Sequence, residues 1–196
     1  MGESSINIKR TFDVAVSALV LLVFSPLYLI LSLIIKIGSK GPVFYSQERI
    51  GRHQKPFTIY KFRTMIVDSE PSGPQLSEHQ DPRITKTGRW MRKYRLDELP
   101  QFWNVLKGDM SVVGPRPERE YYIRQIVKEA PYYTLVCQVR PGITSWGMVK
   151  YGYASNVKQM VERTRFDLIY LSNMSLSVDC KILIYTIKTI LTGKGV

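Results

Sequence analysis

The longest apolar segment of the chain runs from Val14 to Ile35 and contains no charged residue. A helix of this length would measure about 33 Å, against about 30 Å for the hydrocarbon core of a bilayer. The segment is longer than the apolar region of a cleaved signal peptide, and no small-residue cleavage pattern follows it. The pattern therefore predicts a membrane segment that the mature protein keeps.

Ser25 and Pro26 interrupt this segment near its middle. Proline removes a backbone donor and crowds the carbonyl four residues earlier, so a bend is expected, and the Ser25 hydroxyl can bond back to the preceding turn. Basic residues stand on both sides of the segment, a pattern that favours placing both ends in the cytoplasm: Lys9, Arg10, Lys36 and Lys40. These residues leave two interpretations equally open, a re-entrant hairpin and a kinked spanning helix.

The rest of the chain alternates between strand, loop and helix patterns. Val43–Ser46 and Phe57–Phe62 predict two short strands around a turn at Gly51. The polar stretch from Asp68 to Gly88, rich in proline, glycine and serine, predicts a mobile loop that could cover a site. Apolar spacing and end signals predict four helices, at Asp97–Lys107, Glu118–Glu129, Val157–Leu171 and Ser177–Thr192. The last of these could lie on a bilayer surface or be an ordinary core helix with Lys181 and Lys188 in solvent.

Composition narrows the partners to anionic ones. The 196 residues fit one compact domain, and 28 lysines and arginines against 16 acidic residues give a net charge of +12. This balance favours nucleic acid, a phosphorylated substrate or acidic lipid. The two cysteines, Cys137 and Cys180, fit neither a metal-ligand spacing nor a disulfide framework, which indicates a reducing, cytoplasm-facing location.

Asp97 and Glu98 are the carboxylates whose sequence neighbours most favour a catalytic role. Spacing alone explains them structurally, with Asp97 as a helix N-cap, Glu98 in the first turn and Gly108 as the stop. The preceding residues are strongly basic: Arg89, Arg92, Lys93 and Arg95. Helix N-termini bind phosphates, and an ionised aspartate beside cations or a metal can attack phosphorus. Successive helical residues point about 100° apart, so the two carboxylates need not share a proton.

Three further segments are suited to anions. Arg116 is held between Pro115 and Pro117, which restricts the backbone and presents the guanidinium at little ordering cost. Arg140 precedes Pro141 in a similar arrangement, and Lys61 and Arg63 lie at the end of the second predicted strand. Each has an ordinary structural explanation, but together they predict a phosphate-binding pocket.

Five motifs follow one another in a fixed order: Lys61–Met65, Leu96–Gln101, Asn104–Ser111, Gly114–Pro117 and Arg140–Thr144. In these motifs the chain resembles the bacterial sugar transferases, the monotopic phosphoglycosyl transferases. The likeness extends from about Lys9 to the C-terminus, and the length of the chain resembles the small members that consist of the minimal catalytic domain. After Thr144 the residues Ser145–Tyr153 depart from the usual family pattern, so the sugar stays open.

The resemblance implies a two-step reaction. Asp97 would attack the β-phosphate of a UDP-sugar, release UMP and hold a phosphosugar, which then passes to polyprenyl (undecaprenyl) phosphate. Glu98 would support catalysis, and Mg²⁺ would bind Asp97 and the diphosphate. The residues expected to contact nucleotide or phosphate are Lys61, Arg63, Arg92, Pro115, Arg116, Pro117 and Arg140.

The same resemblance favours the re-entrant hairpin, since Ser25 and Pro26 match the family's membrane break. The expected fold is α+β and predominantly helical. A membrane helix-break-helix occupies residues 1–40, and a catalytic domain with a small β-hairpin and amphipathic surface helices occupies 41–196. The expected location is the bacterial cytoplasmic membrane with the catalytic domain facing the cytoplasm, and the expected partners are UDP-sugar, polyprenyl phosphate and membrane lipids, without nucleic acid.

Two rival interpretations make different predictions. A membrane-tethered nucleic-acid-binding protein would use Trp90, Tyr94 and Trp103, which stand among basic residues, and would not need Asp97. A non-catalytic scaffold would use its basic surface only to meet anionic lipid.

Overall fold

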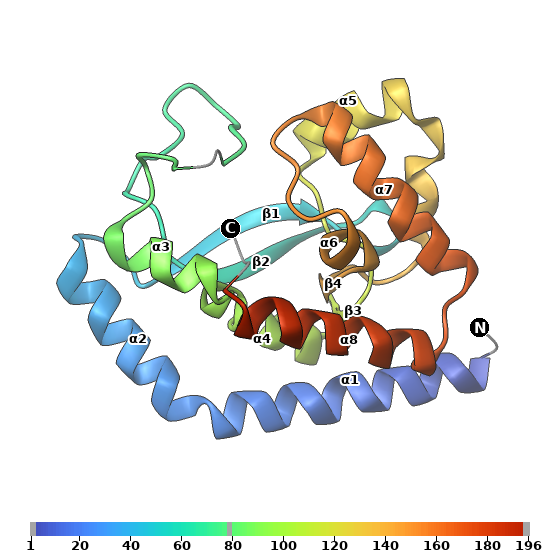
Figure 1. Cartoon of the computed structure of the whole chain (residues 1–196), viewed down its shortest axis with the longest axis horizontal. Coiled ribbons are helices and arrows are strands. Elements are labelled where there is room, and N and C mark those ends of the chain that lie inside the picture. Colours follow the sequence, from blue (N-terminus) through green and yellow to red (C-terminus); the bar gives the residue numbers. More distant parts are fainter. Residues whose placement is uncertain (1–2, 78–79, 194–196) are drawn as a thin grey trace.

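Two helices at the N-terminus form an angled arm along the side of the molecule (Figure 1). The computed structural model describes residues 3–77 and 80–193. Helix α1 (Glu3–Val23) and helix α2 (Ser25–Gly38) meet at a bend of 61°. In Figure 1 the two blue helices follow the lower and left edges, and all the remaining elements lie on the inner side of the bend.

The bend arises at Ser25 and Pro26, through the contacts predicted for them. Pro26 has no N–H to donate to the carbonyl of Leu22, and the Ser25 hydroxyl donates to that carbonyl instead, at 2.8 Å. The predicted break at Ser25 and Pro26 and its local compensation are therefore confirmed. Among the described residues, no helix by itself is both long enough and apolar enough to cross a bilayer, and only the bent pair α1–α2 meets that test together.

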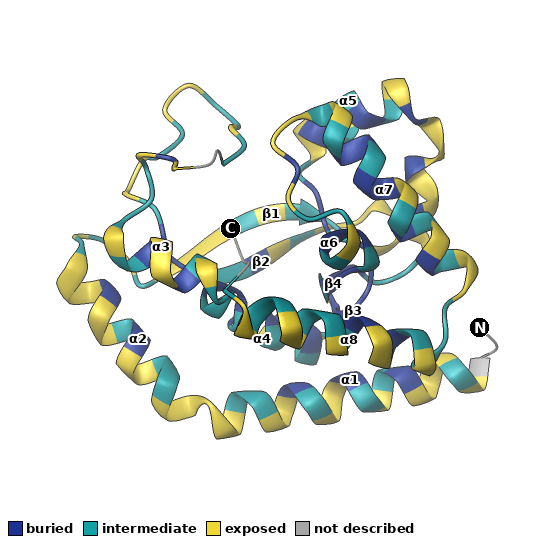
Figure 2. Ribbon diagram, viewed as in Figure 1, coloured by how far each residue is buried: buried dark blue, intermediate teal, exposed yellow. Residues whose placement is uncertain are grey.

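The outer face of the arm is apolar and exposed. Leu22 and Leu29 are each 74% exposed and Ile37 is 78% exposed, whereas Leu31 and Ile35 on the inner face are buried. Figure 2 shows this division as exposed positions along the outside of both helices and buried ones toward the body. A soluble monomer rarely exposes so continuous an apolar surface.

Polar contacts hold α1 against the body. Buried Lys9 donates to Asp179 of helix α8 at 2.6 Å. Asp13 accepts from the Ser111 hydroxyl at 2.7 Å and from the Val112 amide at 3.0 Å. Because buried polar groups need partners, these bonds fix the register of α1 on the neighbouring elements.

The body contains two small sheets. Strands β1 (Phe44–Ile50) and β2 (Pro56–Phe62) form an antiparallel hairpin in which Phe44 pairs with Phe62 and Ile50 with Pro56. The predicted hairpin around Gly51 is thus confirmed, with a first strand that continues past Ser46 to Ile50. Strands β3 (Ser111–Val113) and β4 (Gly142–Thr144) pair in parallel, which the sequence patterns did not reveal.

The helices of the body agree in part with the predicted ones. Helices α5 (Glu120–Glu129), α7 (Val157–Ser172) and α8 (Leu176–Leu191) confirm three predicted segments to within two residues. Helix α6 (Trp146–Lys150) and the 3₁₀ segments Arg52–Gln54 and Pro131–Gln138 were not predicted. Helix α8 packs on the core through Ile182, while Ile184 and Leu191 are 68% and 77% exposed, so it presents one apolar face outward.

The predicted helix Asp97–Lys107 begins in the wrong place. Leu96–Glu98 form a 3₁₀ turn, and helix α4 spans Gln101–Lys107, so Asp97 is not an N-cap. The Leu99 amide donates to the Leu96 carbonyl and the Phe102 amide to the Leu99 carbonyl, both three residues earlier, so the chain winds as 3₁₀ turns before α4. The predicted end is correct, because Gly108 adopts the left-handed conformation with φ of 96°.

The predicted loop from Asp68 to Gly88 contains no helix or strand over residues 68–77 and 80–85, and its last three residues belong to helix α3 (Lys86–Lys93). Residues 78–79 lie outside the described residues. Gly88 lies so close to Thr64 that an added Cβ would meet the Thr64 carbonyl oxygen at 2.1 Å. This close approach places the first turn of α3 beside the end of β2.

Candidate active site

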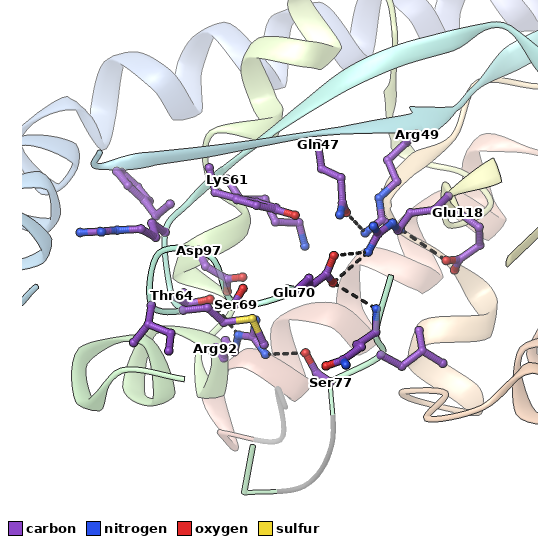
Figure 3. A pocket seen from close by; sticks show the side chains of 18 of the residues that line it. Gln47, Arg49, Lys61, Thr64, Ser69, Glu70, Ser77, Arg92, Asp97 and Glu118 are labelled. Carbon is purple, nitrogen blue, oxygen red and sulfur yellow. Dashed lines mark hydrogen bonds and ion pairs between the residues drawn. The ribbon is translucent and has the colours of Figure 1, made fainter. Parts of the chain in front are cut away.

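A cavity of about 500 Å³ lies at the end of β2, under the segment that precedes α3. The predicted site residues that line it are Lys61, Arg63, Arg92, Asp97 and Arg116. In Figure 3, Asp97, Thr64 and Arg92 lie at one end of the view, Arg49 and Glu118 lie at the other, and Glu70 stands between them. The structure therefore brings most of the predicted residues together although they are far apart in sequence.

Asp97 is a buried carboxylate, 6% exposed. Within the described part of the chain it forms no hydrogen bond or ion pair, which is unusual for a buried acid. Burial raises the pKa of Asp97, an effect that Lys61, Arg92 and Arg95 oppose and the neighbouring Glu98 reinforces. Asp97 is thus held in the cavity with its oxygens available to another molecule.

Glu98 is in the opposite situation, because cations from three segments surround its carboxylate. The Lys61 ammonium lies 3.1 Å from it, the Arg116 guanidinium 3.4 Å and the Arg95 guanidinium 3.6 Å. Burial alone would raise the pKa of Glu98, but these charges outweigh it and lower the pKa to about 2. Glu98 is therefore ionised at neutral pH and is a weak base.

The 3₁₀ turn separates the roles of the two acids. Successive residues in such a turn point about 120° apart, and Asp97 lines the cavity whereas Glu98 is directed at its three cations. Asp97 and Glu98 form no hydrogen bond with each other in the described structure. This arrangement supports the expectation that the two carboxylates need not share a proton.

Arg92 and Arg63 both line the cavity but have different contacts. Arg92 donates to the Thr64 hydroxyl at 2.9 Å and to the Ser77 hydroxyl at 3.0 Å, both at the cavity wall. Arg63 donates to the carbonyls of Ser39 and Lys40, just after α2. Its guanidinium therefore ties the site to the N-terminal arm.

The Pro115–Pro117 loop is held through its backbone. The Pro115 carbonyl accepts from the Gly142 amide at 2.9 Å, and the Pro117 carbonyl accepts from Arg49 at 3.2 Å. Neither proline lines the cavity, so both act on it by fixing Arg116. The Arg116 guanidinium also lies over the Tyr153 ring, 5.3 Å from its centre.

The structure does not place Arg140 in this cavity. Arg140 donates to the Gly108 carbonyl at 2.9 Å and lines a different cavity beside α1. The parallel pairing of β3 and β4 directs the two proline-flanked arginines to different places, which the similar motifs could not reveal. The expected contact between Arg140 and the phosphates at Asp97 is therefore corrected.

Several charged residues of the cavity were not predicted. Arg49 bonds to Glu118 at 3.4 Å, and Arg119 holds Glu70 through two contacts of 2.8 Å. Glu118 and Arg119 directly follow the Pro-Arg-Pro motif, a proximity that could have singled them out. Arg49 gave no sequence signal beyond its place on a predicted hairpin.

The residues of the cavity fit a metal ion only if substrate phosphates supply part of its coordination. Within residues 3–77 and 80–193, no group of three or more histidine, cysteine, aspartate or glutamate side chains could hold an ion. Mg²⁺ is commonly bound by one or two carboxylates together with substrate phosphates. Asp97, with its free oxygens, can supply the protein's share of such a site.

Comparison with known proteins identifies the family of this chain. The bacterial sugar transferase family model matches residues 4–193, and the chain belongs to that family. An Aeromonas hydrophila UDP-N-acetylgalactosamine-undecaprenyl-phosphate N-acetylgalactosaminephosphotransferase is 45% identical over 96% of this chain and 44% of its own length. An Escherichia coli UDP-glucose:undecaprenyl-phosphate glucose-1-phosphate transferase is 38% identical over 92% of this chain and 39% of its own length.

Relative lengths differ among these proteins. The chain spans less than half the length of the two transferases just described. It covers 90% of a Bacillus subtilis sugar transferase, EpsL, which is 38% identical over 96% of this chain.

The contrast between the two acids predicts opposite effects on stability. Glu98→Gln is expected to lower the free energy of unfolding by about 2–4 kcal/mol at pH 7, because it leaves three partly buried cations without their carboxylate. Asp97→Asn is expected to keep or raise stability, because burial already disfavours its ionised form. Thermal unfolding of both variants in neutral detergent measures the difference, and a greater loss in Asp97→Asn would contradict this assignment.

The pH dependence of the Glu98 effect follows from the sign of its pKa shift. The folded-state pKa, about 2, lies below the ordinary 4.5, so the stability from Glu98 is fully present above about pH 4.5 and is lost as pH falls toward 2. The difference in melting temperature between wild type and Glu98→Gln should thus be constant from about pH 7 to 5 and shrink only below that range.

Proposed function

We propose that this chain transfers a sugar 1-phosphate from a UDP-sugar to a polyprenyl phosphate, such as undecaprenyl phosphate, through a covalent intermediate on Asp97. The observation that carries the proposal is a buried, unpaired carboxylate in a cavity lined by cations. The names of two relatives, each a transferase acting on undecaprenyl phosphate, support the substrate class. Such a reaction would begin the assembly of a glycoconjugate or polysaccharide on its lipid carrier.

In the first step, an Asp97 oxygen attacks the β-phosphorus of the UDP-sugar. The bond between that phosphorus and the bridging oxygen breaks, UMP leaves with the electron pair, and the phosphosugar remains on Asp97. In the second step, a phosphate oxygen of the polyprenyl phosphate attacks the same phosphorus. The acyl phosphate bond breaks, which restores the Asp97 carboxylate and gives the polyprenyl diphosphate sugar.

Charge neutralisation makes the first step feasible, since an anion must approach a diphosphate. Lys61, Arg92 and Arg116 line the cavity and can place N–H donors around the phosphates. Asp97 would be the protein's ligand for Mg²⁺, which would neutralise further charge on the phosphates.

Glu98 is proposed to act through its neighbours. Its low pKa makes it a poor proton acceptor, whereas its bonds orient Lys61 and Arg116. Arginine has five N–H donors and a lysine ammonium has three, so both keep donors for the substrate while they contact Glu98. Glu98 is then a positioning residue, and Asp97 is the residue that forms the covalent bond.

The N-terminal arm is proposed to enter one leaflet of the cytoplasmic membrane as a re-entrant hairpin, with the catalytic part facing the cytoplasm. Its exposed apolar outer face and the 61° bend support this placement, as do the basic residues on both flanks. A lipid phosphate at the bilayer surface could then reach Asp97. Arg63 links the end of the arm to the cavity wall.

The catalytic proposal predicts a strict dependence on Asp97. With a panel of UDP-sugars, polyprenyl phosphate and Mg²⁺, Asp97→Asn should lower UMP release at least about 1,000-fold, because the amide is not a nucleophile. Glu98→Gln should also lose activity, and Glu48→Gln, which changes an exposed glutamate on β1, is the matched control. Unchanged turnover in Asp97→Asn would overturn the covalent mechanism, and binding without turnover in wild type would favour a scaffold.

The membrane proposal predicts that both flanks of the arm face the same side. Single cysteines at the exposed positions Asn7 and Lys40, in a chain with Cys180→Ser, should react with an impermeant maleimide from the cytoplasmic side only. A cysteine at exposed Ser72 reports the side of the catalytic part. Labelling of Asn7→Cys and Lys40→Cys from opposite sides would establish a spanning helix instead.

A further inference from the structure

A second cavity, of about 550 Å³, lies beside the first turns of α1 and shares no lining residue with the cavity at Asp97. One part of its wall is apolar and comes from α1, the 3₁₀ segment before β4, and α7 with the turn after it: Ile6, Leu135, Val139, Leu168, Leu171 and Met174. The other part carries four cations, namely Lys9, Arg10, Arg52 and Arg140, and one acid, Asp13. The cavity is therefore amphipathic and strongly basic.

The charges of this cavity are not balanced by the protein. Lys9 is neutralised by Asp179, and Asp13 bonds to Ser111 and to the Val112 amide. Within residues 3–77 and 80–193, the three arginines bond only to backbone carbonyls and form no ion pair with a carboxylate. These bonds are Arg10 to Val105 and Leu106 at 2.7 and 3.1 Å, Arg52 to Gln138 at 3.2 Å, and Arg140 to Gly108 at 2.9 Å.

The effect of this imbalance is visible at Arg140. Burial lowers the pKa of Arg140, and the charges of Arg10 and Arg52 lower it further, against weak support from Asp13. Guanidinium groups that repel one another at the wall of a cavity are stabilised by a bound anion. Arginine is also the side chain best matched to phosphate, through paired N–H donors.

The place of the cavity indicates where the anion comes from. Asp13, at its wall, immediately precedes Val14, where the uncharged apolar run begins. Figure 1 shows this end of α1 beneath the first turns of α8, in agreement with the bond between Lys9 and Asp179. If the arm enters the membrane as proposed above, the cavity lies at the depth of the lipid headgroups. Basic pockets beside membrane helices on the cytoplasmic side are suited to anionic headgroups.

We propose that this cavity binds one anionic phospholipid of the surrounding bilayer, with its phosphate at Arg10, Arg52 and Arg140 and an acyl chain along the apolar wall. The lipid would lock α1 to the β3–β4 region, away from the reaction centre. The proposal rests on the membrane placement of the arm, and it is independent of the chemistry at Asp97.

The test measures lipid-dependent stabilisation of the full chain in neutral detergent. Phosphatidylglycerol should raise the melting temperature of wild type in a saturable manner, because a ligand that binds the folded state stabilises it. The half-saturating concentration should be at least about tenfold higher in Arg52→Gln/Arg140→Gln, since charged hydrogen bonds to the phosphate are lost. Arg124→Gln, at a side chain 73% exposed on α5, is the matched control and should behave as wild type.

Further arms of the test separate the alternatives. Arg52→Gln alone removes a cation with one carbonyl bond and should also raise the half-saturating concentration, so the test stands if the double variant does not fold. An equal response in these variants and wild type, or an equal response to phosphatidylcholine, would overturn the proposal. So would the same stabilisation by inorganic phosphate alone, or displacement of phosphatidylglycerol by equimolar polyprenyl phosphate. Asp97→Asn should keep the full lipid response, so failure of the catalytic proposal can be recognised separately.

Discussion

The Glu98 carboxylate forms ion pairs with three cations from different segments: Lys61 on β2, Arg95 just before the 3₁₀ turn and Arg116 in the loop after β3. Lys61, Arg95 and Arg116 would repel one another strongly in a buried site without it, and a buried acid without cations would itself be costly. This cluster joins three segments beside the cavity, which Lys61 and Arg116 also line. It also leaves Asp97, the preceding residue, with no hydrogen-bonding or ionic partner within the described residues.

Two adjacent acids can have such different environments because of a local backbone constraint. Leu96–Glu98 form a 3₁₀ turn, which directs Asp97 into the cavity and Glu98 toward the cations. The result is one carboxylate with a pKa lowered to about 2 and one with a raised pKa. Groups whose surroundings separate their pKa values in this way are well suited to different roles in a reaction.

Hydrogen bonds connect the N-terminal arm to the cavity at Asp97 and to the rest of the body. Arg63 lines the cavity and holds the backbone after α2, and Asp13 and Lys9 hold α1 to β3 and α8. The proposed lipid site lies where α1 begins its apolar run. A membrane-bound arm would therefore hold the cavity at a fixed height above the bilayer, within reach of a phosphate carried on a lipid.

Much of this organisation could be predicted from the sequence, and the exceptions have physical causes. Apolar periodicity, Pro26 and Gly108 act locally, so the bent arm, the hairpin and most helix ends were predictable. The prediction of Asp97 as an N-cap was wrong because Leu96–Glu98 form a 3₁₀ turn and α4 begins only at Gln101, a difference that local spacing does not reveal. Arg140 was misplaced because only the parallel pairing of β3 and β4 determines where its loop lies, and such long-range pairing leaves no local signal. Arg49 was missed because the sequence around it carries no local signal, whereas Arg119 could have been found from its place directly after the Pro-Arg-Pro motif.

The covalent role of Asp97 is the central claim, and mass spectrometry of the protein after incubation with UDP-sugar and Mg²⁺, without polyprenyl phosphate, tests it most directly. The account predicts a mass increase of one sugar phosphate, located on the peptide that contains Asp97, which disappears when polyprenyl phosphate is added and is absent in Asp97→Asn. Full transfer activity with no such adduct under rapid quenching, or an adduct on another residue, would contradict it.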